Sequence, residues 1–118
     1  MSDLIYEVYQ GEDRTALPFF IRDSLTNVYM DLSTATEITV NAKHKTSGLV
    51  SFTLTGGEIS VVGGTDGKFL LDISDTKSDL LKLGEIDLEV VVDTGAHPGG
   101  IRRVGRLTKA LKVLARLS

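Results

Sequence analysis

GGTDGKFLLDISDTKSDLLKLGEIDLEVVV, residues 63–92, carries the clearest structural signal in this chain. It contains a glycine turn, an apolar run, a polar corner, another glycine and a second apolar run. In the second run Ile86, Leu88, Val90 and Val92 occupy alternate positions. A period of two with one apolar row is typical of a half-buried β-strand. The stretch therefore predicts two strands joined by a short corner.

The same alternation recurs through the rest of the sequence. Apolar rows occur at Leu17/Phe19/Ile21, at Ile38/Val40/Ala42, at Val50/Phe52/Leu54 and at Phe69/Leu71/Ile73, and residues 4–10 suit a first strand. Turns rich in Gly, Asn and Asp separate these rows. The pattern predicts an all-β sandwich or barrel of about seven to nine antiparallel strands. Because Pro18 lacks an amide donor, its strand is expected at an edge or at a bulge.

Two segments are ambiguous between helix and strand. Residues 75–82 suit one short helical turn, with Ser74 or Asp75 as the N-cap. Residues 105–117 have helical propensity, but Leu107, Leu111 and the following odd positions also form a period-two row that Lys109 interrupts. In an all-β setting we predict a final strand there.

Length and composition set further bounds. The 118 residues predict one domain, residues 1–118, large enough for a hydrophobic core. The absence of cysteine excludes disulfides, thiolate metal ligands and cysteine nucleophiles. No run approaches the ~20 apolar residues that span a bilayer, and the N-terminal residues do not resemble a secretory signal. We therefore expect no membrane partner and synthesis in the cytoplasm.

Charge is distributed unevenly along the chain. Residues 1–98 contain 7 basic and 16 acidic residues, a balance of −9, whereas residues 99–118 contain six basic residues and no acid. These six cations are the candidate partner-contact residues: Arg102, Arg103, Arg106, Lys109, Lys112 and Arg116.

The basic segment has two interpretations. Its cations could bind nucleic-acid phosphates, but the segment lacks the interleaved aromatic residues that stack on bases. The favoured interpretation is a contact with another protein, or pairing of this segment with residues 84–93. Such pairing would place the cations beside the outward acids Glu85, Asp87, Glu89 and Asp93. Nucleic acid is therefore not the expected partner.

The remaining polar residues do not predict catalysis. A calcium loop beginning at Asp66 would have Lys68 and Leu70 where ligand oxygens are needed, and Asp-Gly is a preferred pair for tight turns. His44 and His97 are far apart in sequence, and neither has an acidic or hydroxyl partner at a spacing that would indicate a site. Surface or capping roles suit the other aspartates of residues 63–82, which are Asp72, Asp75 and Asp79. We expect no enzyme, no cofactor and no metal site.

Several segments resemble one family of phage proteins. They are GEDRTALPFFIRD (residues 11–23), YMDLSTATEITVNAKHKTSG (29–48), the opening stretch, and LTKALKVL (107–114) as a final strand. Together they resemble the immunoglobulin-like N-terminal module of phage baseplate upper proteins and related small phage proteins. Ile86 stands where those relatives often have Trp or Tyr. None of the matching motifs contains a residue to which the resemblance assigns a binding role.

The resemblance implies an immunoglobulin-like β-sandwich that attaches to neighbouring virion proteins. Because the sequence stops at Ser118, no fibre or receptor-binding domain is expected behind the module. The implied function is a structural virion component, such as a tail, baseplate, connector or decoration protein. It would act by protein–protein assembly, as a homo-oligomer within the particle. The alternative is a carbohydrate-binding or adhesin-like module, although the chain has no Trp and only three Tyr.

Overall fold

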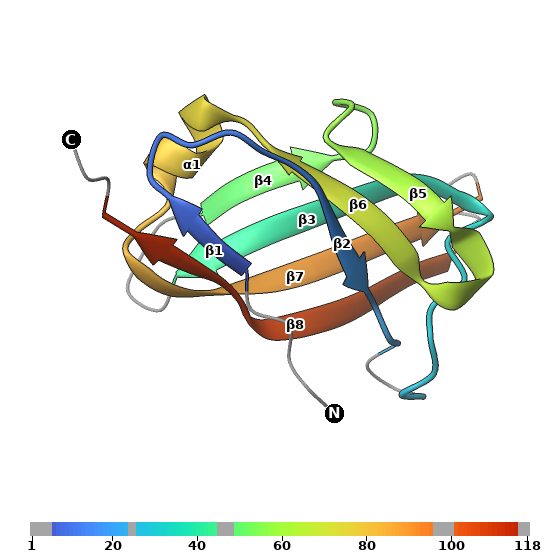
Figure 1. The fold of residues 1–118 in the computed structure, drawn as a ribbon. Helices are drawn as coiled ribbons and strands as arrows, with labels where there is room; N and C mark the ends of the chain where they lie inside the picture. The colour runs from blue at the N-terminus through green and yellow to red at the C-terminus, as the bar shows by residue number, and fades with distance from the viewer. Residues whose placement is uncertain (1–5, 24–25, 45–48, 96–100, 116–118) are drawn as a thin grey trace.

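The computed structural model describes residues 6–23, 26–44, 49–95 and 101–115, which form a mostly β structure (Figure 1). The strands are β1 (Tyr6–Tyr9), β2 (Arg14–Phe20), β3 (Ala35–His44), β4 (Leu49–Thr53), β5 (Ile59–Gly63), β6 (Lys68–Ile73), β7 (Gly84–Thr94) and β8 (Ile101–Leu114). Two short helical segments accompany them, the 3-10 turn η1 (Gly64–Asp66) and the α-helix α1 (Asp75–Leu80). The predicted all-β class is confirmed.

The strands form two sheets, which lie as two layers in Figure 1. The five-stranded sheet has the order β1-β8-β7-β3-β4, and the three-stranded sheet has the order β2-β6-β5. The expectation of antiparallel strands throughout was wrong for one pair, because β1 runs parallel to β8 with Tyr6 opposite Leu111. These two strands lie at opposite ends of the sequence, so no hairpin sets their relative direction.

The predicted apolar rows supply the core. Ile86, Leu88, Val90 and Val92 are all buried and belong to one hydrophobic cluster with the rows of β2, β3 and β6. Of the row in β4, Val50 and Phe52 are buried, whereas position 54 is half-buried at the edge of the cluster. Each strand therefore turns one face inward, as the period of two requires.

Helix α1 forms the corner between β6 and β7. Ser74 is its N-cap, and the Ser74 hydroxyl accepts a hydrogen bond from the Lys77 amide at 3.3 Å. Asp75 is therefore the first helical residue and not the cap. The helix ends at Leu80, two residues earlier than predicted, because Leu81 is extended and buried in the core.

The final segment is a strand, as predicted, and its interruption by Lys109 has a structural cause. Leu107 lies opposite Leu88 and Leu111 lies opposite Ile86, so β8 has two more residues than β7 between these pairs. Lys109 lies in this bulge with a positive φ of 52°. The Lys109 amide donates a hydrogen bond to Asp87 Oδ1 at 2.9 Å, which satisfies a donor that the ladder does not use.

Strand β2 has the edge position expected from its proline. It is the outer strand of the three-stranded sheet and pairs with β6, with Pro18 opposite Leu70. The register shifts just before this point, where Ala16 has a φ of 56° and its amide donates to Asp72 Oδ1 at 2.7 Å. Both bulges therefore place an aspartate of the neighbouring strand against the amide of a residue with positive φ.

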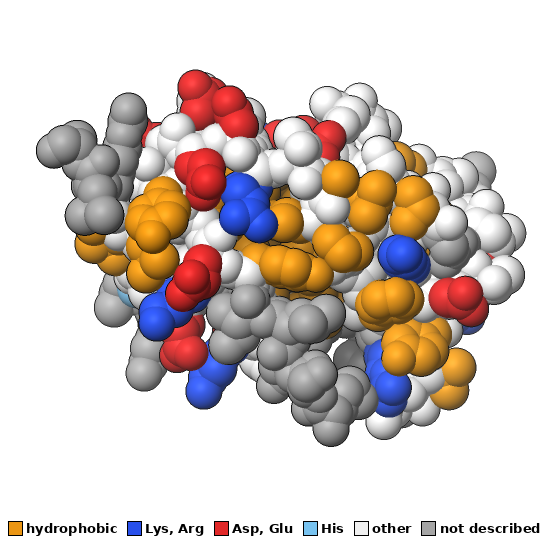
Figure 2. Space-filling model, in the orientation of Figure 1, with side chains coloured by type: hydrophobic (Ala, Val, Ile, Leu, Met, Phe, Trp, Pro, Cys, Tyr) orange, Lys and Arg blue, Asp and Glu red, His pale blue; other side chains and the backbone are white. Residues whose placement is uncertain are grey.

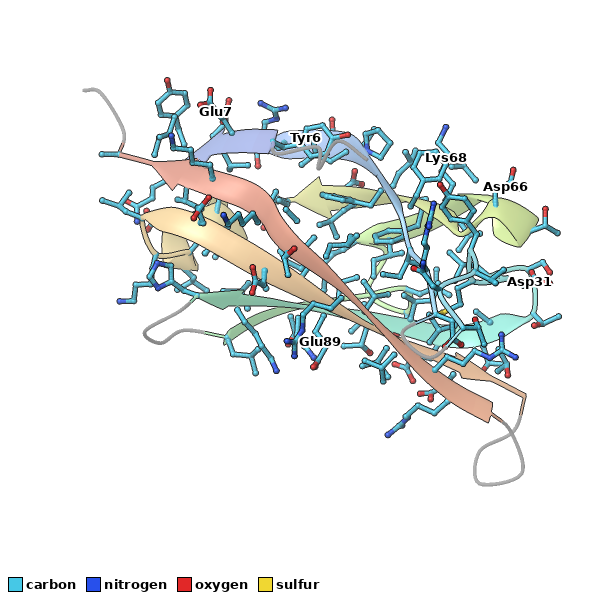
Figure 3. The ribbon with its side chains drawn as sticks, turned by 90° about the horizontal axis from the view of Figure 1, so that it is seen from below. Tyr6, Glu7, Asp31, Asp66, Lys68 and Glu89 are labelled. Carbon is cyan, nitrogen blue, oxygen red and sulfur yellow. The ribbon has the colours of Figure 1, made fainter. Side chains whose placement is uncertain are left out.

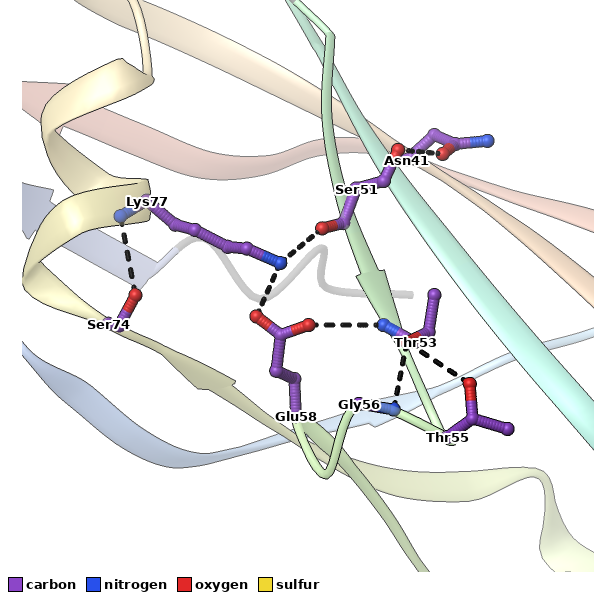
Figure 4. Close-up of polar contacts among 8 residues, drawn as sticks. All are labelled: Asn41, Ser51, Thr53, Thr55, Gly56, Glu58, Ser74 and Lys77. Carbon is purple, nitrogen blue, oxygen red and sulfur yellow. Dashed lines mark hydrogen bonds and ion pairs between the residues drawn. The ribbon is translucent and has the colours of Figure 1, made fainter.

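A lysine on α1 connects the two sheets (Figure 4). Lys77 Nζ lies 2.5 Å from Glu58 Oε2 and donates to the Ser51 carbonyl at 2.5 Å. Ser51 belongs to the five-stranded sheet, and Glu58 directly precedes β5 of the three-stranded sheet. The ammonium also lies 4.8 Å from the centroid of the Phe52 ring. This clamp fixes α1 against both layers.

Candidate functional site

The predicted basic segment lies along β8, beside the acids of β7. In the register of the two strands Asp93 is opposite Arg102, Glu89 is opposite Arg106 and Glu85 is opposite Lys112. The cross-strand placement of cations and acids that the sequence suggested is therefore found. Arg116 lies outside the described residues.

The contacts of these cations differ. Arg102 makes a bidentate pair with Asp93, with distances of 2.7 and 3.2 Å, and this hydrogen bonding raises the pKa of Arg102. Arg103 Nε lies 3.8 Å from Asp23 Oδ2. Glu89 accepts from Lys43 at 3.4 Å, although Arg106 is its cross-strand neighbour.

The outer face of the five-stranded sheet is consequently a surface of mixed sign. Lys112 lies between Glu85 of β7 and Glu7 of β1 in the registers of its two neighbours. Arg102, Arg106 and Lys112 all alternate with acids across the sheet. A surface of alternating charge gives a weaker long-range field than a stripe of one sign. The geometry supports internal electrostatic complementarity more than binding of a phosphate backbone.

Two aspartates of residues 63–92, Asp66 and Asp72, lie at a turn and beside a bulge. Asp66 is exposed in η1, and the following Gly67 has a φ of 68°. A Cβ at Gly67 would lie 2.5 Å from the Ile21 carbonyl oxygen, so the turn requires glycine there. In the described part of the chain, no three His, Cys, Asp or Glu side chains lie close enough together to hold a metal ion.

Of the two histidines, the structure describes His44. His44 ends β3, and its Nε2 lies 2.9 Å from the Leu83 carbonyl oxygen. This contact joins the end of β3 to the segment that leads into β7. His97 lies outside the described residues. Within those residues no helix is long and apolar enough to cross a bilayer.

An apolar patch lies on the outer face of the three-stranded sheet, toward the start of β6 (Figure 2). Its members share an outward or partly outward position on or beside this sheet: Pro18, Phe20, Tyr29, Val62 and Leu70. We call this set the small-sheet patch. Phe20, Tyr29 and Val62 are 43%, 45% and 52% exposed. Scattered apolar residues are normal on a surface, but a contiguous group indicates an interaction site.

Two cations lie within the small-sheet patch. Arg22 lies 4.5 Å from the centroid of the Tyr29 ring and donates to the Tyr29 hydroxyl at 3.2 Å. Lys68, opposite Phe20 in the register, lies 5.7 Å from the centroid of that ring. The Phe20 and Tyr29 rings are 6.1 Å apart. Aromatic side chains and Arg at the centre of a patch are typical of protein interfaces.

A second exposed apolar surface lies at α1. Leu80 is 61% exposed and Leu83 is 50% exposed. Beside them is an open hollow lined by Gly11, Asp75, Thr76, Asp79 and Leu80. Asp13 also reaches α1, because its Oδ1 accepts the Asp75 amide at 2.6 Å. This surface therefore combines leucines with carboxylates.

The sequence did not reveal these two surfaces as sites. The position of Phe20 opposite to the inward row was visible, but nothing in the sequence placed Tyr29 and Val62 beside it. The signal that could have found the small-sheet patch is the apolar character of both faces of residues 17–20 and 68–71. A strand with a solvated outer face shows polar residues at every second position.

Comparison with known proteins leaves the family open. No protein-family model matches the sequence, and no curated protein and no solved structure matches the chain.

Proposed function

We propose that this chain is a structural component of a bacteriophage particle that acts by protein–protein assembly. The class includes tail, baseplate, connector and decoration proteins. The observation that carries the proposal is the small-sheet patch, an aromatic surface with two cations. It lies on a scaffold in which every buried side-chain N or O atom of the described residues has a hydrogen-bond partner. The resemblance of residues 10–93 to phage baseplate modules supplies the setting, and virion localisation is part of the proposal.

The proposal includes an immunoglobulin-like sandwich. The order β2-β6-β5 in one sheet and β8-β7-β3-β4 in the other is the order in which immunoglobulin-like domains arrange strands B-E-D and G-F-C-C′. The short helix α1 then lies between the strands equivalent to E and F. This correspondence supports the fold that the sequence resemblance implies, and an experimental structure would test it.

The functional proposal is tested on particles from the host that carries the gene. Particles purified on a density gradient would be digested and analysed by quantitative mass spectrometry. We expect peptides of this chain in a fixed ratio to the major virion proteins, because an assembled part has a defined copy number. A chain found only in the soluble fraction of the lysate would contradict the proposal. Salt-washed particles provide the control for adventitious adsorption.

One observation favours a carbohydrate-binding module as a second candidate. Phe20 and Tyr29 are exposed side by side, and exposed aromatic rings are the usual platforms for sugar rings. The guanidinium of Arg22 over the Tyr29 ring leaves less of that platform open. A glycan array that compares the wild type with Tyr29→Ala separates the candidates. Specific glycan binding that is lost in this variant would favour the carbohydrate module.

A further inference from the structure

The molecule has two unlike apolar surfaces at opposite ends. Strand β6 begins at Lys68, inside the small-sheet patch, and the chain reaches α1 directly after the other end of this strand. The described residues extend 48 Å along their longest axis. The start of β6 lies at the end of the molecule away from α1 (Figure 1). Figure 3 labels Lys68 at this start, and Asp66 of the preceding turn η1 beside it.

The first end is aromatic and carries cations. Phe20, Tyr29 and Val62 are exposed there, with Arg22 and Lys68 among them. In the part of the chain that the structure describes, no ion pair to a carboxylate is found for either cation. Two acids lie near this end: Asp66 is exposed, and Asp31 accepts hydrogen bonds from the amide and the hydroxyl of Ser33.

The second end carries leucines and carboxylates. Leu80 and Leu83 are exposed beside the hollow whose lining includes Asp75 and Asp79. Asp79 makes no ion pair with a cation among the described residues, and Lys82 is the exposed cation nearby in sequence. The two ends therefore offer complementary features, since one presents aromatic rings with cations and the other presents leucines with acids.

We propose that the small-sheet patch of one copy docks on the α1 surface of a second copy, so that chains associate head to tail. Lys68 and Arg22 of one copy would face Asp79 and Asp75 of the next, and Phe20 and Tyr29 would cover Leu80. This inference rests on the proposed function and names the partner and the surface. A contact between two different patches is heterologous and generates a ring or an open filament.

The available area suits such a contact. From roughly 200 Å² per aromatic side chain, Phe20 and Tyr29 at 43% and 45% exposure present roughly 90 Å² each. With Val62 and the half-buried members, the small-sheet patch presents on the order of 300 Å² of apolar surface. A standard interface buries about 800 Å² per partner, of which somewhat more than half is apolar. The patch thus supplies more than half of the apolar area of one side.

A head-to-tail contact explains both surfaces, whereas a face-to-face contact explains one. Two small-sheet patches that met across a two-fold axis would bring Lys68 and Arg22 toward their own copies and would leave Leu80 and Leu83 in water. Like charges that face each other across an interface oppose association. The opposite charges of the two ends therefore favour the heterologous arrangement.

Complementary variants test this arrangement. The variant Phe20→Ser/Lys68→Glu damages the aromatic end, and the variant Asp79→Lys/Leu80→Ser damages the α1 end. The matched control is Val104→Glu, because Val104 is 39% exposed on the outer face of the other sheet. Sedimentation velocity at increasing concentration measures the mass, and circular dichroism shows that each variant is folded. If Phe20→Ser/Lys68→Glu does not fold, Val62→Glu replaces it, because Val62 is 52% exposed.

The expected results separate the possibilities. Wild type and Val104→Glu associate, and each double variant alone weakens association roughly 30-fold or more, as loss of an interface hot spot does. An equimolar mixture of the two double variants forms a complex of two chains, because one intact contact remains. A mixture that stays monomeric, or loss of association only in the aromatic-end variant, would overturn the head-to-tail contact. Either failure would be compatible with finding the chain in purified particles, since a virion protein can bind other proteins without binding itself.

Discussion

The coupling energy between Lys77 and Glu58 should be larger than that of a surface ion pair. The ammonium and the carboxylate are 2.5 Å apart, and the two side chains are only 28% and 22% exposed. Exposed ion pairs contribute about 0.2–1 kcal/mol, and hydrogen bonds to charged groups contribute about 1.5–3 kcal/mol. A mostly buried pair falls between these ranges, so we expect a coupling energy of about 1–2 kcal/mol.

A double-mutant cycle measures this coupling. Glu58→Gln and Lys77→Met keep the size of each side chain, and Met retains the apolar stem over Phe52. Urea unfolding of the wild type, both single variants and the double variant would be followed by circular dichroism. Lys77→Met alone should cost more than the coupling energy, because it also removes the hydrogen bond to the Ser51 carbonyl. We expect a loss of roughly 2 kcal/mol, or a decrease in Tm of roughly 6–10 °C for a domain of this size.

The chain contains a matched control pair. Lys43 and Glu89 are 3.4 Å apart, and the Lys43 side chain is 48% exposed. The same cycle at this pair should give about 0.5 kcal/mol. A coupling at Glu58–Lys77 no larger than that of the control would refute the claim that α1 is clamped electrostatically between the sheets.

Three further predictions concern single positions. Gly105→Ala should destabilise the fold by about 1–3 kcal/mol in urea unfolding, because a Cβ there would lie 2.6 Å from atoms of residues 21–22; a loss below about 0.5 kcal/mol would contradict the close approach. Asp87→Ala should cost about 1 kcal/mol by the same measurement, since it removes the acceptor of the Lys109 amide in the bulge, whereas Asp87→Asn should retain most of the stability. Hydrogen bonds from Ser33 hold the pKa of Asp31 below its ordinary value of 3.8. The Asp31 charge therefore stabilises the folded state fully above that value and less as the pH falls through the lowered pKa. The difference in unfolding free energy between the wild type and Asp31→Asn should shrink in acid, and a difference independent of pH would count against this contribution.

The sequence was informative wherever one face of a strand is buried. The alternation of Ile86, Leu88, Val90 and Val92 predicted β7 and its inward face, and the structure confirmed both. The final strand was also predictable, because the row at Leu107 and Leu111 is compatible with a strand in an all-β setting. The sequence showed that Lys109 interrupts this row but not that the cause is a bulge, since a bulge depends on the register with a neighbour.

Features that depend on pairing between distant segments could not be predicted from the sequence. The parallel pairing of β1 with β8 joins the two ends of the chain, and no local signal sets its direction. The small-sheet patch was missed for a similar reason. Phe20, Tyr29 and Val62 come from three separate segments, and only the pairing of β2, β6 and β5 and the bridge between Arg22 and Tyr29 bring them together. Candidate sites of this kind are defined by topology and not by spacing.

Self-association through the two ends of the molecule is what we propose for this protein. The most direct test is the mass of the unmodified chain in solution, measured by sedimentation velocity over a wide concentration range at low and at high salt. We expect the mass to rise above 12.7 kDa with concentration. Salt should weaken this association, because opposite charges face each other across the contact. A chain that remains at the monomer mass under all these conditions would contradict it.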